Sequence, residues 1–124
     1  MSYELMFWRQ VSMMTLSSKS IYESLNENRM VDGLSDLPID DMIFDLTNLF
    51  PDAVRESYES RESIVWFSQN HEDSFRVTWS PQHLRVDCHR LPLNQVNEIV
   101  SIGAKFGCPL YDPQTGERFR FSSQ

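Results

Sequence analysis

Several features are scarce in this 124-residue sequence, and each absence excludes a class of protein. No uncharged apolar run is long enough to cross a bilayer, and the first ten residues lack the basic start and long apolar core of a signal peptide. The only two cysteines, Cys88 and Cys108, fit neither a zinc-site spacing nor a secreted disulfide framework. We therefore expect a cytoplasmic protein with reduced thiols and without a metal or cofactor.

Glycine and proline are also few, at four and six residues, while 40% of the residues are hydrophobic. This composition is typical of a globular chain rather than of a disordered or low-complexity one. A chain of this length buries a core without disulfides, but it is too short to divide comfortably into two units. We predict a single domain that spans residues 1–124.

Basic residues are outnumbered 18 to 11 by acidic ones, and the net charge of −7 disfavours nucleic acid or an anionic membrane as a direct ligand. The imbalance is local. The segment from Glu23 to Asp73 contains 13 acidic residues and three arginines, a net charge of −10, and the rest of the chain carries +3. Such asymmetry influences the choice of partner and the association rate rather than the fold.

Hydrophobic spacing predicts three elements in the first half of the chain. Residues 3–9 alternate as a strand with large apolar groups on both faces, which favours a central position in a sheet. Ser20 and Glu23 have the spacing of a capping box and predict a short first helix. Between Pro38 and Pro51, a second helix is predicted by a stripe of apolar residues at i, i+3, i+4 and i+7 spacing, namely Ile39, Met42, Ile43, Leu46, Leu49 and Phe50.

The second half predicts a three-stranded meander over residues 63–90, a third helix and a last short strand or hairpin. Asn94 is the expected N-cap of the third helix, Gly107 is its expected C′ residue, and PQTG is the expected hairpin turn. The order is β-α-α-β-β-β-α-β. It predicts an α+β fold, with a mostly antiparallel sheet of about five strands and two to three helices packed on one face.

Residue types capable of catalysis are present, but their placement does not favour a reaction. Adjacent side chains of a strand point to opposite faces, so Cys88 and His89 cannot form a dyad, and we expect Cys88 to be an inert core residue. His83 and His89 would lie about 20 Å apart, too far for a shared metal. Asp87 and His89 share a face, where a solvated pair is the simpler interpretation. We predict no catalytic residue.

The polar side of the second helix carries Asp40, Asp41, Asp45 and Asn48. The helix dipole stabilises Asp40 and Asp41, which lie in the first turn. Asp45 stands four residues after Asp41, which is an unfavourable spacing for two like charges. Phe44 also falls on this polar side. Either another element covers Phe44, or it is an exposed aromatic ringed by carboxylates, as expected of an interface anchor for a cationic partner.

Three blocks of the sequence resemble a family of small stand-alone bacterial proteins. They are the opening MSYELMFW, the central PIDDMIFDLTNLFPD and the closing AKFGCPLYDPQTGERF, of which the YDPQ turn is the most specific. Some similar small acidic proteins are immunity proteins of contact-dependent inhibition or other polymorphic toxin systems. The segment from Ala53 to Arg90 matches only loosely, and partner specificity in immunity proteins would vary there.

The resemblance and the acidic segment together predict an immunity protein that binds a cognate toxin domain, a basic nuclease, as a monomer in a 1:1 complex. The alternative is a small acidic regulatory or adaptor domain that binds another cytosolic protein. In either case we expect no direct binding of nucleic acid or membrane. The predicted partner-binding residues are Asp40, Asp41, Phe44, Asp45, Asp52, Glu56, Glu59, Glu62, Glu72 and Asp73.

Overall fold

The structure of the protein is a computed structural model that describes residues 2–10, 16–58 and 61–118. The described helices are α1 (Ser18–Asn26), α2 (Ile39–Leu49) and α3 (Leu93–Lys105). The described strands are β1 (Ser2–Phe7), β2 (Val54–Tyr58), β3 (Arg61–Phe67), β4 (Ser74–Ser80), β5 (His83–His89), β6 (Leu110–Asp112) and β7 (Glu117–Arg118). Among these helices, none has the length and apolar character needed to cross a membrane.

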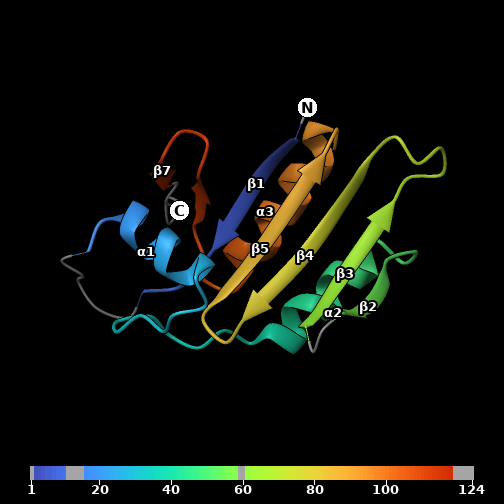
Figure 1. The fold of residues 1–124 in the computed structure, drawn as a ribbon. Coiled ribbons are helices and arrows are strands. Elements are labelled where there is room, and N and C mark those ends of the chain that lie inside the picture. Colours follow the sequence, from blue (N-terminus) through green and yellow to red (C-terminus); the bar gives the residue numbers. More distant parts are fainter. Residues whose placement is uncertain (1, 11–15, 59–60, 119–124) are drawn as a thin grey trace.

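All seven strands belong to one antiparallel sheet with the order β2-β3-β4-β5-β1-β6-β7 (Figure 1). The predicted α+β class is confirmed, as is the central position of β1, which pairs with β5 on one side and β6 on the other. The meander β3-β4-β5 is also confirmed. The sheet has more strands than the predicted five because the short strands β2 and β7 extend it at its two edges.

The helices lie in two layers. Met42, Ile43 and Leu46 of α2 and Val96, Ile99 and Ile102 of α3 share one core cluster with the sheet residues Leu5, Phe7, Phe75, Val77 and Val86. Figure 1 shows α2 and α3 behind the sheet. A second cluster joins Ile21 and Leu25 of α1 to Met6, Trp8 and Tyr111. Since Met6 alternates with Leu5 and Phe7 along β1, α1 covers the opposite face.

The ends of the helices differ in part from the predictions. The N-cap of α1 is Ser17 rather than Ser20, because the Ser17 Oγ accepts a hydrogen bond of 3.1 Å from the Ser20 backbone N–H. Pro92 rather than Asn94 precedes α3. The C′ role of Gly107 is confirmed: its φ is +76°, and the N–H groups of Gly107 and Cys108 donate to the carbonyls of Ala104 and Gly103.

The YDPQ turn joins the two ends of the described chain. Gln114 continues the β1–β6 pairing beyond its last residue pair, because its side-chain amide accepts from the Glu4 N–H at 2.6 Å and donates to the Glu4 C=O at 3.2 Å. Asp112 accepts from the Gln114 backbone N–H within the turn, and the ring of Tyr111 packs on Trp8 and Tyr22. The predicted role of this motif as a structural hairpin is therefore confirmed.

A buried glutamine fixes the loop between α1 and α2. The Gln82 side chain lies in the β4–β5 turn, accepts from the Val31 N–H at 2.8 Å and donates to the Val31 C=O at 2.9 Å. Arg9 binds the other end of this loop, where its guanidinium donates to the Ser35 Oγ and to the Asp36 C=O. These contacts determine where α2 begins, and hence how α2 sits on the sheet.

His83, in the same turn, is buried and lies on the face opposite to α2 and α3. Its Nδ1 is 2.6 Å from the Ser80 Oγ. Burial and, to a smaller extent, the nearby positive charge of Arg85 lower the pKa of the imidazole from 6.5 to about 4. The folded protein therefore holds His83 in its neutral form.

Replacing Gly103 with alanine should destabilise the fold. An added Cβ would lie 2.5 Å from Cδ1 of the fully buried Phe7 ring. Overpacking costs about 1–3 kcal/mol, and the better helix propensity of alanine offsets about 1 kcal/mol of that, so we expect a net loss of up to about 2 kcal/mol in urea unfolding. In a double-mutant cycle with Phe7→Leu, part of the loss should be recovered; strictly additive effects would contradict the steric explanation.

Stability should also fall between pH 6.5 and pH 4. Because the folded pKa of His83 lies below its unfolded value, the unfolded chain takes up the proton first as the pH falls. The stabilisation is complete above pH 6.5, and about 3 kcal/mol of it is lost on acidification to pH 4. Urea unfolding at a series of pH values should show a flatter dependence for His83→Gln. His71→Asn, which replaces an exposed histidine, is the control and should keep the wild-type pH dependence. If stability depends on pH as steeply in His83→Gln as in the wild type, His83 is not the cause of the loss.

Candidate functional site

Helix α2 divides its residues between the core and the surface. Met42, Ile43 and Leu46 are buried against the sheet, while Asp40 and Asp41 lie exposed in the first turn. Among the side chains that the structure describes, no salt bridge is formed with either carboxylate. Favourable interaction with the helix dipole thus accounts for their position, and both charges face solvent.

Phe44, whose environment the sequence left open, is an exposed aromatic residue. Its relative exposure is 63%, and no described element covers it. A phenylalanine side chain that is fully buried gains about 1.5–3 kcal/mol relative to an exposed one, so this position gives up stability that a buried phenylalanine would supply. The sequence left open whether another element covers Phe44 or the residue is exposed. The structure shows the exposed arrangement, which is the one expected of an interface anchor.

Asp45 has a partner within the chain. Its carboxylate lies 2.7 Å from the Nζ of Lys105 at the end of α3, and its side chain is only 22% exposed. This ion pair compensates for the unfavourable spacing between Asp41 and Asp45, and it joins α2 to α3. Asp45 therefore has a structural role that the sequence interpretation did not include, and the predicted contact residues of this helix that remain without a partner in the described part of the chain are Asp40, Asp41 and Phe44.

A groove of about 370 Å³ runs between α2 and β2. Phe44 stands on its helix side and Arg55 on its strand side, and its other lining residues are Asp40, Ile43, Thr47, Ala53 and Ile64. A second hollow of about 390 Å³ lies at the start of α2, from Leu37 to Asp41. Asp40 lines both, so the two hollows meet at the first turn of the helix. We refer to these hollows and their rims as the α2–β2 surface.

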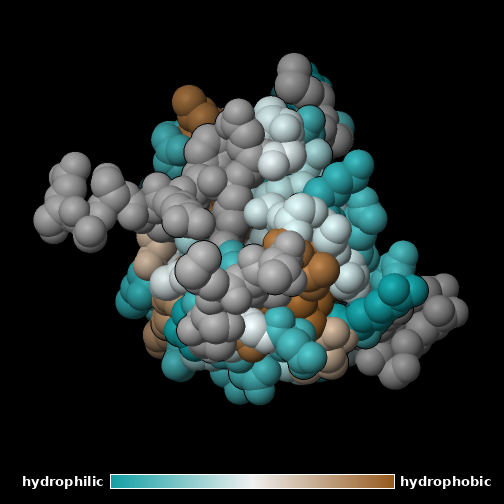
Figure 2. Space-filling model, turned by 90° about the vertical axis from the view of Figure 1, so that its left-hand side faces the viewer, coloured by the Kyte–Doolittle hydropathy of each residue, from teal (hydrophilic) through white to brown (hydrophobic). Residues whose placement is uncertain are grey.

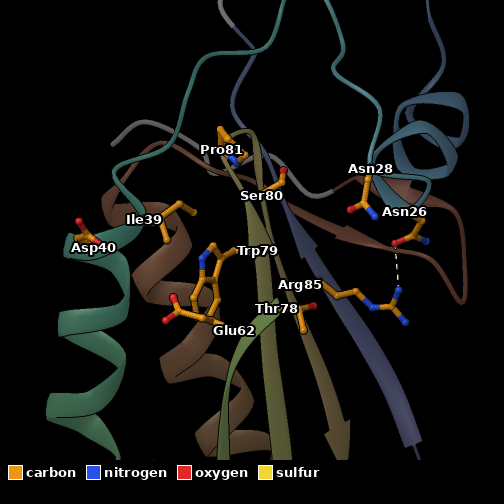
Figure 3. A pocket seen from close by; sticks show the side chains of 10 residues that line it. All are labelled: Asn26, Asn28, Ile39, Asp40, Glu62, Thr78, Trp79, Ser80, Pro81 and Arg85. Atoms are coloured by element: carbon orange, nitrogen blue, oxygen red, sulfur yellow. Dashed lines mark hydrogen bonds between the residues drawn. The ribbon is translucent and has the colours of Figure 1, made fainter. Parts of the chain in front are cut away.

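A larger depression of about 720 Å³ extends from Asp40 across the end of β4 (Figure 3). In Figure 3, Trp79 lies with Ile39, Asp40 and Glu62 on one side, and Arg85 with Asn26 and Asn28 on the other. The guanidinium of Arg55 lies 5.7 Å from the Trp79 ring centroid and 2.9 Å from the Glu62 carboxylate. An arginine is therefore already held at this place by an aromatic ring and a carboxylate.

The other predicted contact residues fall into three groups. Asp52 is exposed just after α2, and no described basic residue forms a salt bridge with it. Glu56 on β2 and Glu62 on β3 pair with Arg76 and Arg55, at 4.0 and 2.9 Å. Glu72 and Asp73 lie in the loop between β3 and β4, at the end of these strands away from the β2–β3 turn. Glu59 lies outside the described residues.

The prediction that Cys88 is a core residue is confirmed. Its side chain is buried on the core face, and burial raises the pKa of the thiol to about 12, with a further contribution from the charge of Asp87. Asp87 itself accepts hydrogen bonds from Arg85, which also binds Glu4 and Asn26. This network ties the sheet to α1. In the described residues, no three of the potential ligand side chains His, Cys, Asp and Glu converge as a metal site would require.

The Ser80–His83 pair is a feature that the sequence interpretation missed. It brings a hydroxyl and an imidazole together, and Ser80 also lines the large depression. The same Ser80 Oγ accepts a hydrogen bond from the Gln82 backbone N–H, as a serine at the start of a turn usually does. In the sequence, this pair could have been found only from the three-residue spacing between Ser80 and His83. That spacing is typical of a turn rather than of a reactive dyad.

Figure 2 shows the side of the molecule that carries α1 and β7, where the coloured residues are mainly teal and white and the brown ones lie in separate patches. The exposed aromatic with neighbouring carboxylates on α2 is thus the feature of the described chain that most resembles a protein-binding site. Comparisons with protein-family models, with curated proteins and with solved structures gave no match to this chain.

Proposed function

We propose that this chain is an immunity protein that binds a cognate toxin domain, a basic nuclease, and neutralises it by covering its cationic cleft. The observation that carries the proposal is the exposure of Phe44 on the rim of a groove, on the same helix as the outward-facing Asp40 and Asp41. Binding interfaces commonly combine a central aromatic anchor with charged groups that guide the approach of the partner.

The distribution of charge supports a cationic partner. The chain carries −7 overall, so it attracts positively charged proteins at long range. Several acids of the segment from Glu23 to Asp73 are neutralised within the chain, among them Asp45 by Lys105 and Glu62 by Arg55. Asp40, Asp41 and Asp52 are among the exposed acids of this segment that remain for a partner, and Asp40 and Asp41 lie on the same helix as Phe44. A nuclease presents lysines and arginines to the phosphates of its substrate, and these would meet the same carboxylates.

We propose that the protein inhibits the toxin domain by steric and electrostatic contacts and catalyses no reaction itself. Phe44 would enter an apolar recess of the toxin domain, and the neighbouring carboxylates would pair with cations that otherwise contact nucleic acid. A nuclease whose cationic cleft is covered loses its route to the substrate phosphates. Tight binding to one partner, rather than turnover, is the property that such a protein needs.

Phe44→Ala should weaken binding to the toxin domain encoded by the neighbouring reading frame by about 30-fold, or about 2 kcal/mol, as for a central anchor. The affinity is measured by calorimetry with purified proteins. Met30→Ala is the matched control, since Met30 is 65% exposed and lies on the loop after α1. Equal affinities of the two variants would contradict the role of Phe44, and failure of the wild-type protein to bind would contradict the proposed function.

Asp41→Lys should act mainly on the association rate. Reversing an exposed charge at the rim reduces electrostatic steering, so association should slow several-fold at low salt, and the difference should shrink at high salt. Stopped-flow or surface-plasmon measurements at two salt concentrations test this. Glu98→Lys, which makes the same change at an exposed position on α3, should have a smaller effect. An unchanged association rate in Asp41→Lys would remove the first turn of α2 from the docking surface.

A further inference from the structure

Strand β2 forms one edge of the sheet, with β3 as its only neighbour among the described strands (Figure 1). In an antiparallel ladder, alternate residues of an edge strand direct their N–H and C=O groups away from the neighbouring strand. Over Val54–Tyr58, two or three residues therefore present backbone donors and acceptors toward the outside of the sheet. Another extended chain could pair with these groups.

Exposed hydrophobic side chains gather on both sides of this edge. Seven large hydrophobic residues of the described chain are strongly exposed, and four of them lie on α2, β2 and β3: Phe44, Leu49, Val54 and Phe67. Val54 is paired with Val65, and Phe67 follows Val65 by two, so both belong to the face opposite α2. Phe44 and Leu49 lie on the α2 side. The edge of β2 is thus flanked by apolar surface on each face of the sheet.

This two-sided arrangement favours a strand as the occupant rather than a helix. Side chains of an added strand alternate between the two faces, so one set would reach the groove beside Phe44 and the other would contact Val54. The groove of about 370 Å³ lies along β2 on the α2 side, with Ala53, Arg55 and Ile64 at its strand wall. A helix laid on α2 would cover Phe44 but would leave Val54 and Phe67 exposed.

The charges around the edge determine the chemistry of the occupant. Arg55 on β2 and Arg76 on β4 are engaged with acids, Arg55 with Glu62 at 2.9 Å and Arg76 with Glu56 at 4.0 Å. Asp40 lines the groove and Asp41 lines the hollow beside it, and neither has a salt bridge among the side chains that the structure describes. An extended segment with lysine or arginine at alternate positions complements this surface, whereas an acidic segment would be repelled.

A second copy of this chain is a poorer occupant. Each copy carries −7, so two copies repel at long range. Symmetric pairing of two β2 strands centred on Arg55 would place two guanidinium groups opposite each other, and pairing centred on Glu56 would do the same with two carboxylates. With the helices of the two copies on the same face of the joined sheet, both arrangements are unfavourable because they bring like charges together.

We infer that the partner contributes an extended basic segment that adds to β2 as a further strand of the sheet, with its alternate side chains in the α2–β2 groove and against Val54. This inference rests on the proposed function, since it assigns the binding mode of the same partner. The added strand gains affinity from main-chain hydrogen bonds, and selectivity comes from the groove and from the carboxylates around it.

Hydrogen exchange tests the inference directly. The complex with the toxin domain encoded by the neighbouring reading frame should show at least tenfold slower exchange than the free protein at alternate amides of residues 54–58. Protection confined to α2, in a complex that still requires Phe44, would overturn the added strand while leaving the proposed function intact. Absence of any complex would instead contradict the proposed function. A free protein that is already dimeric, with these amides protected before the partner is added, would also overturn the inference.

Two proline variants provide a second test. Glu56 and Ser57 are adjacent on β2, so one N–H faces β3 and the other faces outward. Proline is tolerated on an edge strand where the N–H faces solvent. Of Glu56→Pro and Ser57→Pro, the variant that keeps the wild-type unfolding transition should lose at least tenfold in affinity. Wild-type affinity in that folded variant would overturn the inference, and if neither variant folds, the exchange measurement decides.

Discussion

The fold depends on one property of β1, whose successive side chains are buried on both faces of the sheet. Leu5 and Phe7 are buried with α2 and α3, whereas Met6 and Trp8 are buried with α1. A strand of this kind must lie between two layers, so it occupies the middle of the sheet. The meander β2-β3-β4-β5 then extends from it in one direction, and α2 lies near the far edge with its acidic side toward solvent.

The features that the sequence predicted well are those encoded within a single segment. The apolar stripe of α2 and the left-handed backbone of Gly107 need no information from elsewhere in the chain. Strand β2 was missed because an edge strand buries few side chains, and exposed residues such as Val54 and Glu56 leave little alternation to detect. The N-cap of α1 was displaced from Ser20 to Ser17, since several serines precede this helix and each is a competent cap.

The parts of the candidate site that depend on distant residues could not be predicted. Local helix rules left Asp45 without an explanation, and its partner Lys105 is 60 residues away. The exposure of Phe44 likewise depends on how α2 packs beside β2, so the sequence could only state the two alternatives. Gln114 and Glu4 are 110 residues apart, yet their hydrogen bonds join the opening and closing blocks of the sequence. That contact gives both blocks a role in the fold.

The α2–β2 surface combines an exposed aromatic, outward-facing carboxylates and an open strand edge, and these three features together favour a cationic protein partner. The central claim is that such a partner is a nuclease and that binding inactivates it. Titration of this protein into the nuclease domain encoded by the neighbouring reading frame tests the claim most directly. The account predicts a linear loss of nuclease activity that ends at one equivalent. Full activity in the presence of a tenfold excess of the folded protein would contradict it.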